Sequence, residues 1–155
     1  MKEAWIRRAI ELAVENVRSS RGGPFGAVVI KDDRLLATGV NLVTTAKDPS
    51  AHAEIVAIRA ACQALGTFEL QGCEIYCSCE PCPMCLGALY WARLSACYYA
   101  CTRDEAAEAG FDDKFIYSEI ALPPAQRGVP GYHVDAGNRL EPFREWSASA
   151  SKVLY

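Results

Sequence analysis

The sequence lacks a long hydrophobic run, an export signal and an excess of basic residues. Its apolar stretches fall short of the ~20 residues that a membrane-spanning helix needs. Its N-terminus has no apolar segment followed by a small-residue cleavage site. The formal net charge of -3 provides no basic surface for a nucleic acid. We therefore expect a cytoplasmic protein that binds neither a membrane nor a nucleic acid.

Histidine is scarce and cysteine is plentiful, with 2 and 8 residues among 155. A short exported chain would pair so many cysteines in disulfides, but this chain is long and its cysteines cluster between residues 73 and 85. A reduced protein that uses some of them to bind a metal fits better. About half of the residues are apolar, so we expect a single core and one domain over residues 1–155.

Two short motifs, about thirty residues apart, carry residues suited to metal chemistry. His52 precedes Glu54 by two positions, and Cys82 and Cys85 form a C-x-x-C pair. Zinc prefers thiolate and imidazole ligands, and a catalytic zinc leaves one of its four positions to water. We expect His52, Cys82 and Cys85 to bind zinc, and Glu54 to transfer protons to and from the water that zinc activates. The combined pattern is typical of zinc-dependent nucleobase deaminases.

The spacing within each motif predicts how these side chains meet. Cys82 and Cys85 lie about 60° apart around a helix and share one of its faces. His52 and Glu54 lie roughly 200° apart, so they converge only beyond the N-terminal end of their helix. We therefore expect two helix N-termini to point at one metal, where their partial positive charge favours thiolate.

A structural zinc with four protein ligands is the alternative. Cys79 and Cys82 form a second, overlapping C-x-x-C pair, and Cys77 and Cys79 flank the end of a strand, so either could reach the metal. Glu54 has no role beside a closed site, which favours the catalytic interpretation. His133, the other histidine, is expected to be a surface or packing residue.

Apolar residues recur with helical or strand spacing along the chain. Helices are predicted over residues 2–18, 51–65, 83–93, 104–109, 112–120 and 140–150. Strands are predicted over residues 25–30, 35–40, 73–78 and 96–100, with a short one near 132–134. The first two strands form a hairpin, and the alternation that follows predicts parallel neighbours with helices on the faces of the sheet. Both halves of the metal motif fall after strands, at the edge where sites form in such sheets.

Local signals predict how two of these helices begin, end and pack. Ser50 is expected to cap the helix over residues 51–65, and Gly66 to end it. The helix over residues 2–18 is expected to turn one apolar stripe toward the core. The members of this stripe are Trp5, Ile6, Ala9, Ile10, Ala13, Val14 and Val17.

Much of the chain resembles bacterial guanine deaminases of the cytidine-deaminase-like fold. The matching stretches are residues 22–27, Asn41, 48–54, 78–88, 90–93, Asp104 and 106–113. The stretches over 90–93 and 109–113 discriminate best, because the histidine and cysteine blocks occur in many deaminases. The resemblance implies a three-layer α/β/α sandwich with a central mixed five-stranded sheet. It also implies hydrolysis of guanine to xanthine and ammonia with a zinc cofactor, in a homodimer that exchanges its C-terminal segments, about residues 125–155.

The resemblance also assigns roles in binding the substrate. Phe25 would stack on the purine, while Asn41 and Asp113 would hydrogen-bond its polar edge. Trp91 would line the pocket, and Tyr155 of the partner subunit would help to close it. Without the resemblance, the aromatic residues read as core, Asn41 as a turn residue and Asp113 as a helix cap.

Other functions stay open. A related deaminase could act on tRNA adenosine, cytosine, a nucleoside or an aminotriazine such as ammeline. A zinc-stabilised interaction module without turnover is the alternative from another class, and it would require a fourth protein ligand, with Cys79 the first candidate.

Overall fold

The computed structural model describes residues 2–155. The chain divides into two compact units, Met1–Phe115 and Ile116–Tyr155. Among the described residues no helix combines the length and the apolar character that crossing a membrane requires. The exchange of C-terminal segments and the cytoplasmic location stay predictions.

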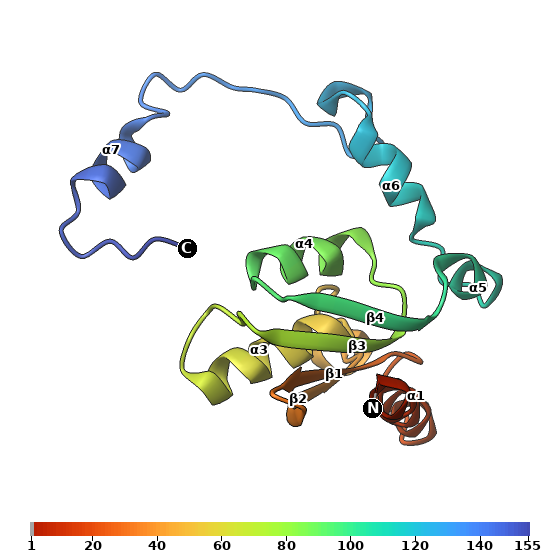
Figure 1. Ribbon diagram of the computed structural model, residues 1–155. Coiled ribbons are helices and arrows are strands. Elements are labelled where there is room, and N and C mark those ends of the chain that lie inside the picture. Colours follow the sequence, from red (N-terminus) through yellow and green to blue (C-terminus); the bar gives the residue numbers. More distant parts are fainter. Residues whose placement is uncertain (1) are drawn as a thin grey trace. The chain divides into compact units, whose positions relative to one another are not determined.

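The first unit is built on a mixed sheet (Figure 1). Its strands are β1 (Gly26–Lys31), β2 (Arg34–Val40), β3 (Cys73–Cys79) and β4 (Ala96–Cys101), in the order β2-β1-β3-β4. β1 pairs antiparallel with both β2 and β3, and β3 pairs parallel with β4. The hairpin returns β2 along the edge of β1, so β1 separates β2 from β3 and only the last pair of strands is parallel.

The prediction of a fifth strand in the sheet is wrong. The described residues form a 4-stranded sheet, and residues 132–134 lie in an irregular segment. A strand requires a hydrogen-bonded neighbour, and this short stretch lies between Pro130 and Gly137, residues that favour turns and irregular backbone.

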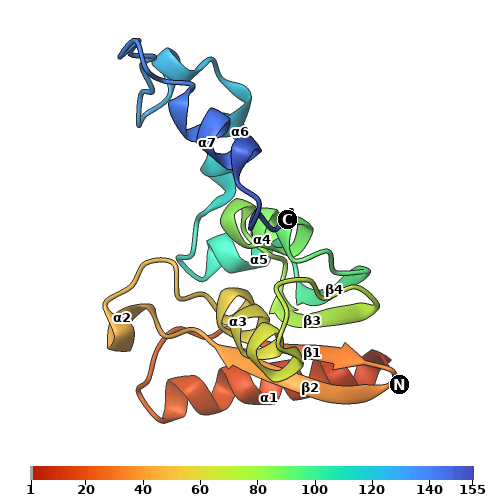
Figure 2. The ribbon, with the colours of Figure 1, turned by 90° about the vertical axis from the view of Figure 1, so that its left-hand side faces the viewer.

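Helices cover both faces of the sheet, as predicted (Figures 1 and 2). Because side chains alternate along a strand, the strands contribute to two separate apolar clusters. One cluster packs the sheet against α3 (Ala53–Leu65) and α4 (Pro83–Trp91), and contains Ala27, Val29, Ile75 and Cys77 from the strands. The other packs it against α1 (Lys2–Arg18), and contains Val28, Ile30 and Tyr76.

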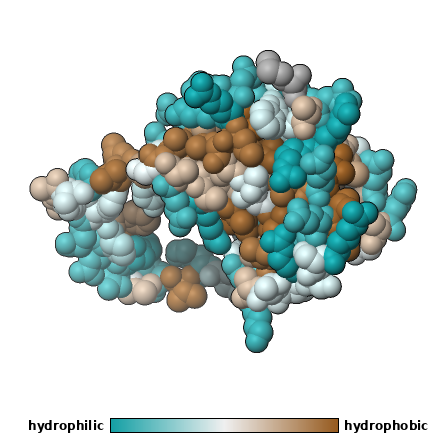
Figure 3. All heavy atoms as spheres, turned by 90° about the horizontal axis from the view of Figure 1, so that it is seen from below, coloured by the Kyte–Doolittle hydropathy of each residue, from teal (hydrophilic) through white to brown (hydrophobic). Residues whose placement is uncertain are grey.

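The face that α1 buries differs from the predicted stripe. Its buried residues are Ala9, Leu12, Ala13 and Asn16, whereas Ile10, Val14 and Val17 are each 40% exposed or more. The helix approaches the sheet very closely, since a Cβ on Gly26 would lie 2.3 Å from the carbonyl oxygen of Ala9. Small residues permit this contact, and the helix turns them inward. Figure 3 shows hydrophobic side chains lying among hydrophilic ones on the face seen from below.

The ends of α3 position the site. The prediction that Gly66 ends α3 is confirmed: it has a φ of 65°, and its N–H donates to Cys62 and Gln63. The prediction that Ser50 caps the helix is wrong, because the N-cap residue is His52. Ser50 instead donates its backbone N–H and its hydroxyl to the Asp48 carboxylate, at 2.8 and 2.7 Å.

Shorter helices complete the chain. In the first unit, α2 (Val43–Ala46) follows β2, and α5 (Arg103–Glu108) begins with a capping box between Thr102 and Glu105. α6 (Lys114–Ala121) begins just before the boundary between the units. The 3-10 turn η1 (Pro124–Gln126) and α7 (Glu141–Ala148) belong to the second unit. None of residues 116–155 is buried.

Candidate active site

Three predicted metal ligands meet where two helices begin. His52 is the N-cap residue of α3, Cys82 is the N-cap residue of α4, and Cys85 lies in the first turn of α4. The Nδ1 atom of His52 lies 3.5 Å from the Sγ atoms of both Cys82 and Cys85. Within residues 2–155 this is the one group of three possible metal ligands whose donor atoms lie within 4.8 Å of one another.

The spacing of these atoms fits a tetrahedral zinc. Bond lengths of about 2.3 Å to sulfur and about 2.0 Å to nitrogen place those two atoms about 3.5 Å apart on a tetrahedron. This is the distance between His52 Nδ1 and each thiol sulfur. Three ligands from the chain leave the fourth position for water, as in catalytic zinc sites.

Local electrostatics prepare Cys82 to bind a cation. Hydrogen bonds from the Cys85 thiol, from His52 and from the Cys85 backbone N–H lower the pKa of Cys82 to about 4. The hydrogen bond to Cys82 and burial raise the pKa of Cys85. Zinc binds the thiolate form of cysteine, so metal binding would release the protons that these thiols carry. The hydrogen bond to Cys82 also raises the pKa of His52.

Glu54 lies in the first turn of α3 and is only 8% exposed. The Sγ of Cys85 donates to its Oε2 at 3.5 Å. Burial raises the pKa of Glu54 above the usual 4.5, because a carboxylate removed from water loses its solvation. A buried carboxyl group beside the metal ligands can accept a proton and return it without leaving its position.

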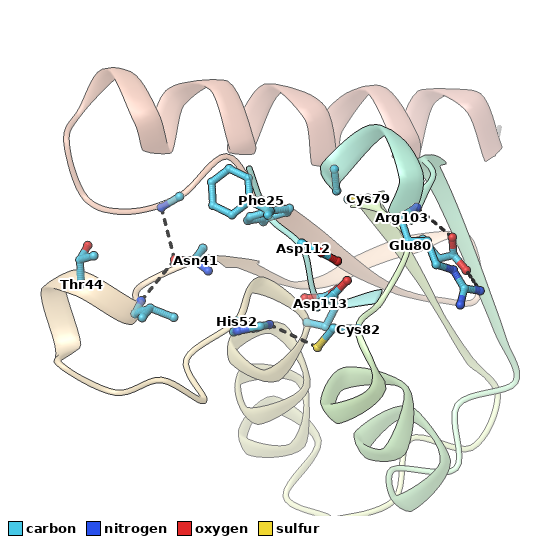
Figure 4. Close-up of a pocket in the computed structure, with 15 residues that line it drawn as sticks. Phe25, Asn41, Thr44, His52, Cys79, Glu80, Cys82, Arg103, Asp112 and Asp113 are labelled. Atoms are coloured by element: carbon cyan, nitrogen blue, oxygen red, sulfur yellow. Dashed lines mark hydrogen bonds and ion pairs between the residues drawn. The ribbon is translucent and has the colours of Figure 1, made fainter. Parts of the chain in front are cut away.

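His52, Glu54 and Cys82 line a pocket in the first unit with a volume of about 360 Å³, which suits a single small aromatic molecule. Figure 4 shows the pocket between the segment that follows α1, the start of α3, the start of α4 and the segment after α5. Its lining residues are Gly23, Phe25, Asn41, Val43, Thr44, His52, Glu54, Cys79, Glu80, Cys82, Arg103, Ala106, Phe111, Asp112 and Asp113.

Asn41 has a fixed orientation in the pocket. Its Oδ1 accepts hydrogen bonds from the backbone N–H groups of Gly23 and Val43, both at 3.3 Å (Figure 4). Two backbone donors on one side of the amide identify that side as the oxygen. The Nδ2 group therefore remains as a hydrogen-bond donor toward the contents of the pocket.

Two phenylalanines form an aromatic corner of the pocket. The rings of Phe25 and Phe111 are 5.0 Å apart and meet edge to face at 87°. Such contacts hold a ring in place, so Phe25 presents a fixed apolar surface. Phe111 was not among the predicted site residues, because an aromatic residue in a loop carries no sequence signal of its own.

Asp113 brings a second carboxyl group to the pocket, and in Figure 4 it lies beside His52 and Cys82. Burial, and then the negative charge of Cys82, raise its pKa above the usual 3.8. The neighbouring Asp112 accepts a hydrogen bond from the backbone of Lys114 at 3.1 Å and so helps to fix this segment.

An ion pair that the sequence did not predict joins the metal-binding loop to α5. The Nη2 of Arg103 lies 2.5 Å from Oε1 of Glu80, and the backbone N–H of Arg103 donates to Oε2 at 3.0 Å. These hydrogen bonds lower the pKa of Glu80. The two residues are 23 positions apart, and only the parallel pairing of β3 with β4 brings them together. Thr44 also lines the pocket without having been predicted.

Cys77 and Cys79 do not join the group of metal ligands. Cys79 lines the pocket, and its thiol donates to the carbonyl of Thr102 at 3.8 Å. Burial raises the pKa of Cys79 to about 11, so it remains a thiol at neutral pH. The fourth ligand that a closed structural site requires is therefore not supplied by either residue.

The last two predicted contacts, Trp91 and Tyr155, are not among the residues that line the pocket. Trp91 is the final residue of α4, is 65% exposed and is not among the residues that line the pocket. Tyr155 belongs to the second unit, where its ring lies 6.4 Å from that of Trp146. His133 is an exposed residue of the same unit. The roles of Trp91 and Tyr155 in binding the substrate stay predictions.

Comparison with known proteins agrees with this geometry. Residues 1–101 match the model of the cytidine and deoxycytidylate deaminase zinc-binding region. The chain is 53% identical to a guanine deaminase of Bacillus subtilis over 99% of its own length and 98% of the relative's. The crystal structure of guanine deaminase from Bacillus subtilis, also 53% identical, superposes with a TM-score of 0.97 and the same coverage of both chains.

More distant relatives share part of the chain. A structure solved in complex with 2,6-diaminopurine is 36% identical and has a TM-score of 0.70, over 73% of this chain and 63% of the other. A tRNA-specific adenosine deaminase of Agrobacterium fabrum is 42% identical over 58% of this chain and 61% of the relative.

Proposed function

Because the chain belongs to the cytidine and deoxycytidylate deaminase zinc-binding family, we propose that it hydrolyses guanine to xanthine and ammonia. One observation carries the proposal: three residues suited to bind zinc and a buried glutamate meet at a pocket of about 360 Å³. The likeness to a guanine deaminase over 99% of the chain supports the choice of substrate.

His52, Cys82 and Cys85 would hold the zinc, which when bound supplies a Lewis acid that activates water. Glu54 takes the proton from the attacking water as oxygen bonds to C2 of guanine. It delivers this proton to N3, then takes a second proton from the new hydroxyl group on C2 and delivers it to the amino group, which leaves as ammonia as the C2–N bond breaks and the carbonyl forms. The carboxylate is regenerated at the end of the cycle, so Glu54 serves as both base and acid.

The pocket offers groups that match a purine. Phe25 provides a flat apolar surface for the ring system. The Nδ2 donor of Asn41 suits a ring or carbonyl acceptor, and the Asp113 carboxylate suits an N–H donor. Guanine carries acceptors and donors along its polar edge. The relative solved with 2,6-diaminopurine supports a purine ligand.

We further propose a homodimer in which the C-terminal segments, about residues 125–155, are exchanged, with Trp91 and the partner's Tyr155 completing the pocket. No residue of 116–155 is buried, although the segment carries large apolar side chains, among them Phe143, Leu154 and Tyr155, which are 67%, 75% and 72% exposed. A segment of this composition gains stability by packing against another surface.

Deamination of adenosine in tRNA is the rival function, because the Agrobacterium relative shares 42% identity over 58% of this chain. That substrate needs a basic surface for the RNA backbone, whereas this chain carries a net charge of -3. The match to a guanine deaminase also extends over the C-terminal part.

Ammonia release from the zinc-loaded protein tests the choice of substrate. Guanine, adenine, cytosine, cytidine and a tRNA anticodon stem that contains adenosine would be assayed side by side. The proposal predicts release from guanine. Release from another member would keep the zinc chemistry and replace the substrate. A zinc-loaded protein that releases no ammonia from any of the five would contradict the proposal and favour a non-catalytic module.

A further inference from the structure

Asn16 is a buried polar side chain that does not line the pocket but is bonded to residues that do. It lies on α1 and is 0% exposed. Its Nδ2 donates two hydrogen bonds, to the carbonyl oxygen of Gly23 at 2.9 Å and to that of Asn41 at 2.8 Å. One side-chain amide thus connects α1 to both segments that hold the Asn41 side chain.

The backbone around this amide is tightly packed. A Cβ on Gly22 would lie 2.0 Å from the carbonyl oxygen of Asn41 and 3.2 Å from the Nδ2 of Asn16. The N–H of Asn41 donates to the carbonyl of Phe25 at 3.1 Å. The segment before β1 and the segment after β2 therefore meet around Asn16, and each carries one proposed contact to the purine.

The stability of the fold does not by itself explain why an asparagine occupies position 16. Its Oδ1 is buried and has no hydrogen-bond partner among the described residues. Burying an acceptor without a partner is unfavourable, and such groups call for an explanation beyond packing. The two bonds made by Nδ2 supply that explanation, because they act on the backbone that orients Asn41.

We propose that Asn16 is a positioning residue that sets the orientation of the Asn41 amide in the pocket. It holds the carbonyl groups of Gly23 and Asn41, which fixes the backbone N–H groups of Gly23 and Val43. Those two N–H groups hold Oδ1 of Asn41, so Nδ2 points toward the substrate. The kinetic consequence rests on the proposed function, whereas the effect on the backbone does not.

A double-mutant cycle tests the kinetic consequence. Asn16→Ala should lower kcat/KM for guanine about two- to tenfold, the effect of one misplaced hydrogen bond, mainly by raising KM per zinc-loaded site. In the Asn41→Ala background the same substitution should have little effect, because the side chain that it positions is absent. Equal losses in both backgrounds, or a loss explained by zinc content, would overturn the proposal.

Backbone amide exchange tests the same proposal without turnover. Asn16→Ala should speed exchange of the Gly23 and Val43 amides and leave those of β3 unchanged. Asn16→Leu, which keeps the volume but lacks the donor, should do the same. Glu15→Ala, an exposed neighbour on α1, is the control and should change neither. Unchanged exchange at Gly23 and Val43 would overturn the proposal, even if the wild-type protein proved inactive on guanine.

Discussion

The Oε2 atom of Glu54 lies 3.5 Å from the Sγ of Cys85, although 31 positions separate the two residues. This contact places a buried carboxyl group directly beside a metal ligand. Glu54 comes from the first turn of α3 and Cys85 from the first turn of α4. The two helix N-termini therefore converge, as the spacing of the motifs predicts.

Replacing Glu54 with Gln should separate metal binding from catalysis. The three zinc ligands remain, so zinc content should stay at one per chain. Turnover of guanine should fall by about 10²- to 10⁴-fold, the usual contribution of general acid–base catalysis. Zinc content and steady-state rates measured on the same sample check this. Glu15→Gln, an exposed carboxylate on α1, is the control; near-wild-type rates in Glu54→Gln would exclude the proton transfer assigned to it.

Substitution and labelling of Cys79 would distinguish a metal site with three protein ligands from a closed site with four. Because it lies outside the ligand group, Cys79→Ser should keep one zinc per chain, whereas Cys82→Ser should lose most of the metal. In the wild type, burial holds the pKa of Cys79 at about 11. Iodoacetamide labelling of Cys79 should therefore be slow at pH 8 and rise with pH toward that value, since only the thiolate reacts.

Two results would identify Cys79 as a fourth ligand instead. One is loss of zinc in Cys79→Ser. The other is labelling at pH 8 that begins only after a chelator removes the metal.

Gly39 should tolerate no side chain. A Cβ at this position would lie 2.1 Å from the carbonyl oxygen of Ala53 and 2.4 Å from the backbone nitrogen of Ala57, both in α3. Gly39→Ala should lower the free energy of unfolding by about 1–3 kcal/mol, as overpacking does. Urea denaturation of zinc-loaded protein measures it. Thr38→Ala, an exposed neighbour on β2, is the control, and an equal effect of both would contradict the close contact.

Mixed dimers would show whether the C-terminal segment is exchanged. A Glu54→Gln chain and a chain with Tyr155 deleted should each be impaired as homodimers. After unfolding and refolding together, mixed dimers should regain activity, because one site then combines an intact Glu54 with an intact partner tail. Activity no higher than the sum of the separate proteins would show that each pocket is completed within one chain.

The chemistry of the site was easier to predict than its surroundings. The spacing of His52 from Glu54, and of Cys82 from Cys85, predicts how these side chains meet, because helix geometry fixes their angular separation. Asn41 and Asp113 were assigned by resemblance only. The bond between Glu80 and Arg103 could not be predicted, because it depends on the pairing of β3 with β4.

The errors in the fold also have physical causes. Hydrophobicity alone placed Ile10, Val14 and Val17 in the core, but close packing of α1 on Gly26 selects small residues. Ser50 is a good N-cap residue, but it is used in a turn with Asp48, and the helix begins after His52. In both cases the local sequence allows two arrangements, a different buried face of α1 or a different first residue of α3, and tertiary contacts select one of them.

The most direct test of the whole account is the product balance of guanine turnover with and without zinc. The zinc-loaded protein should form one xanthine for each ammonia released. A chelator should abolish both products together, and added zinc should restore both. Turnover that survives complete removal of zinc, or ammonia that appears without xanthine, would contradict the account.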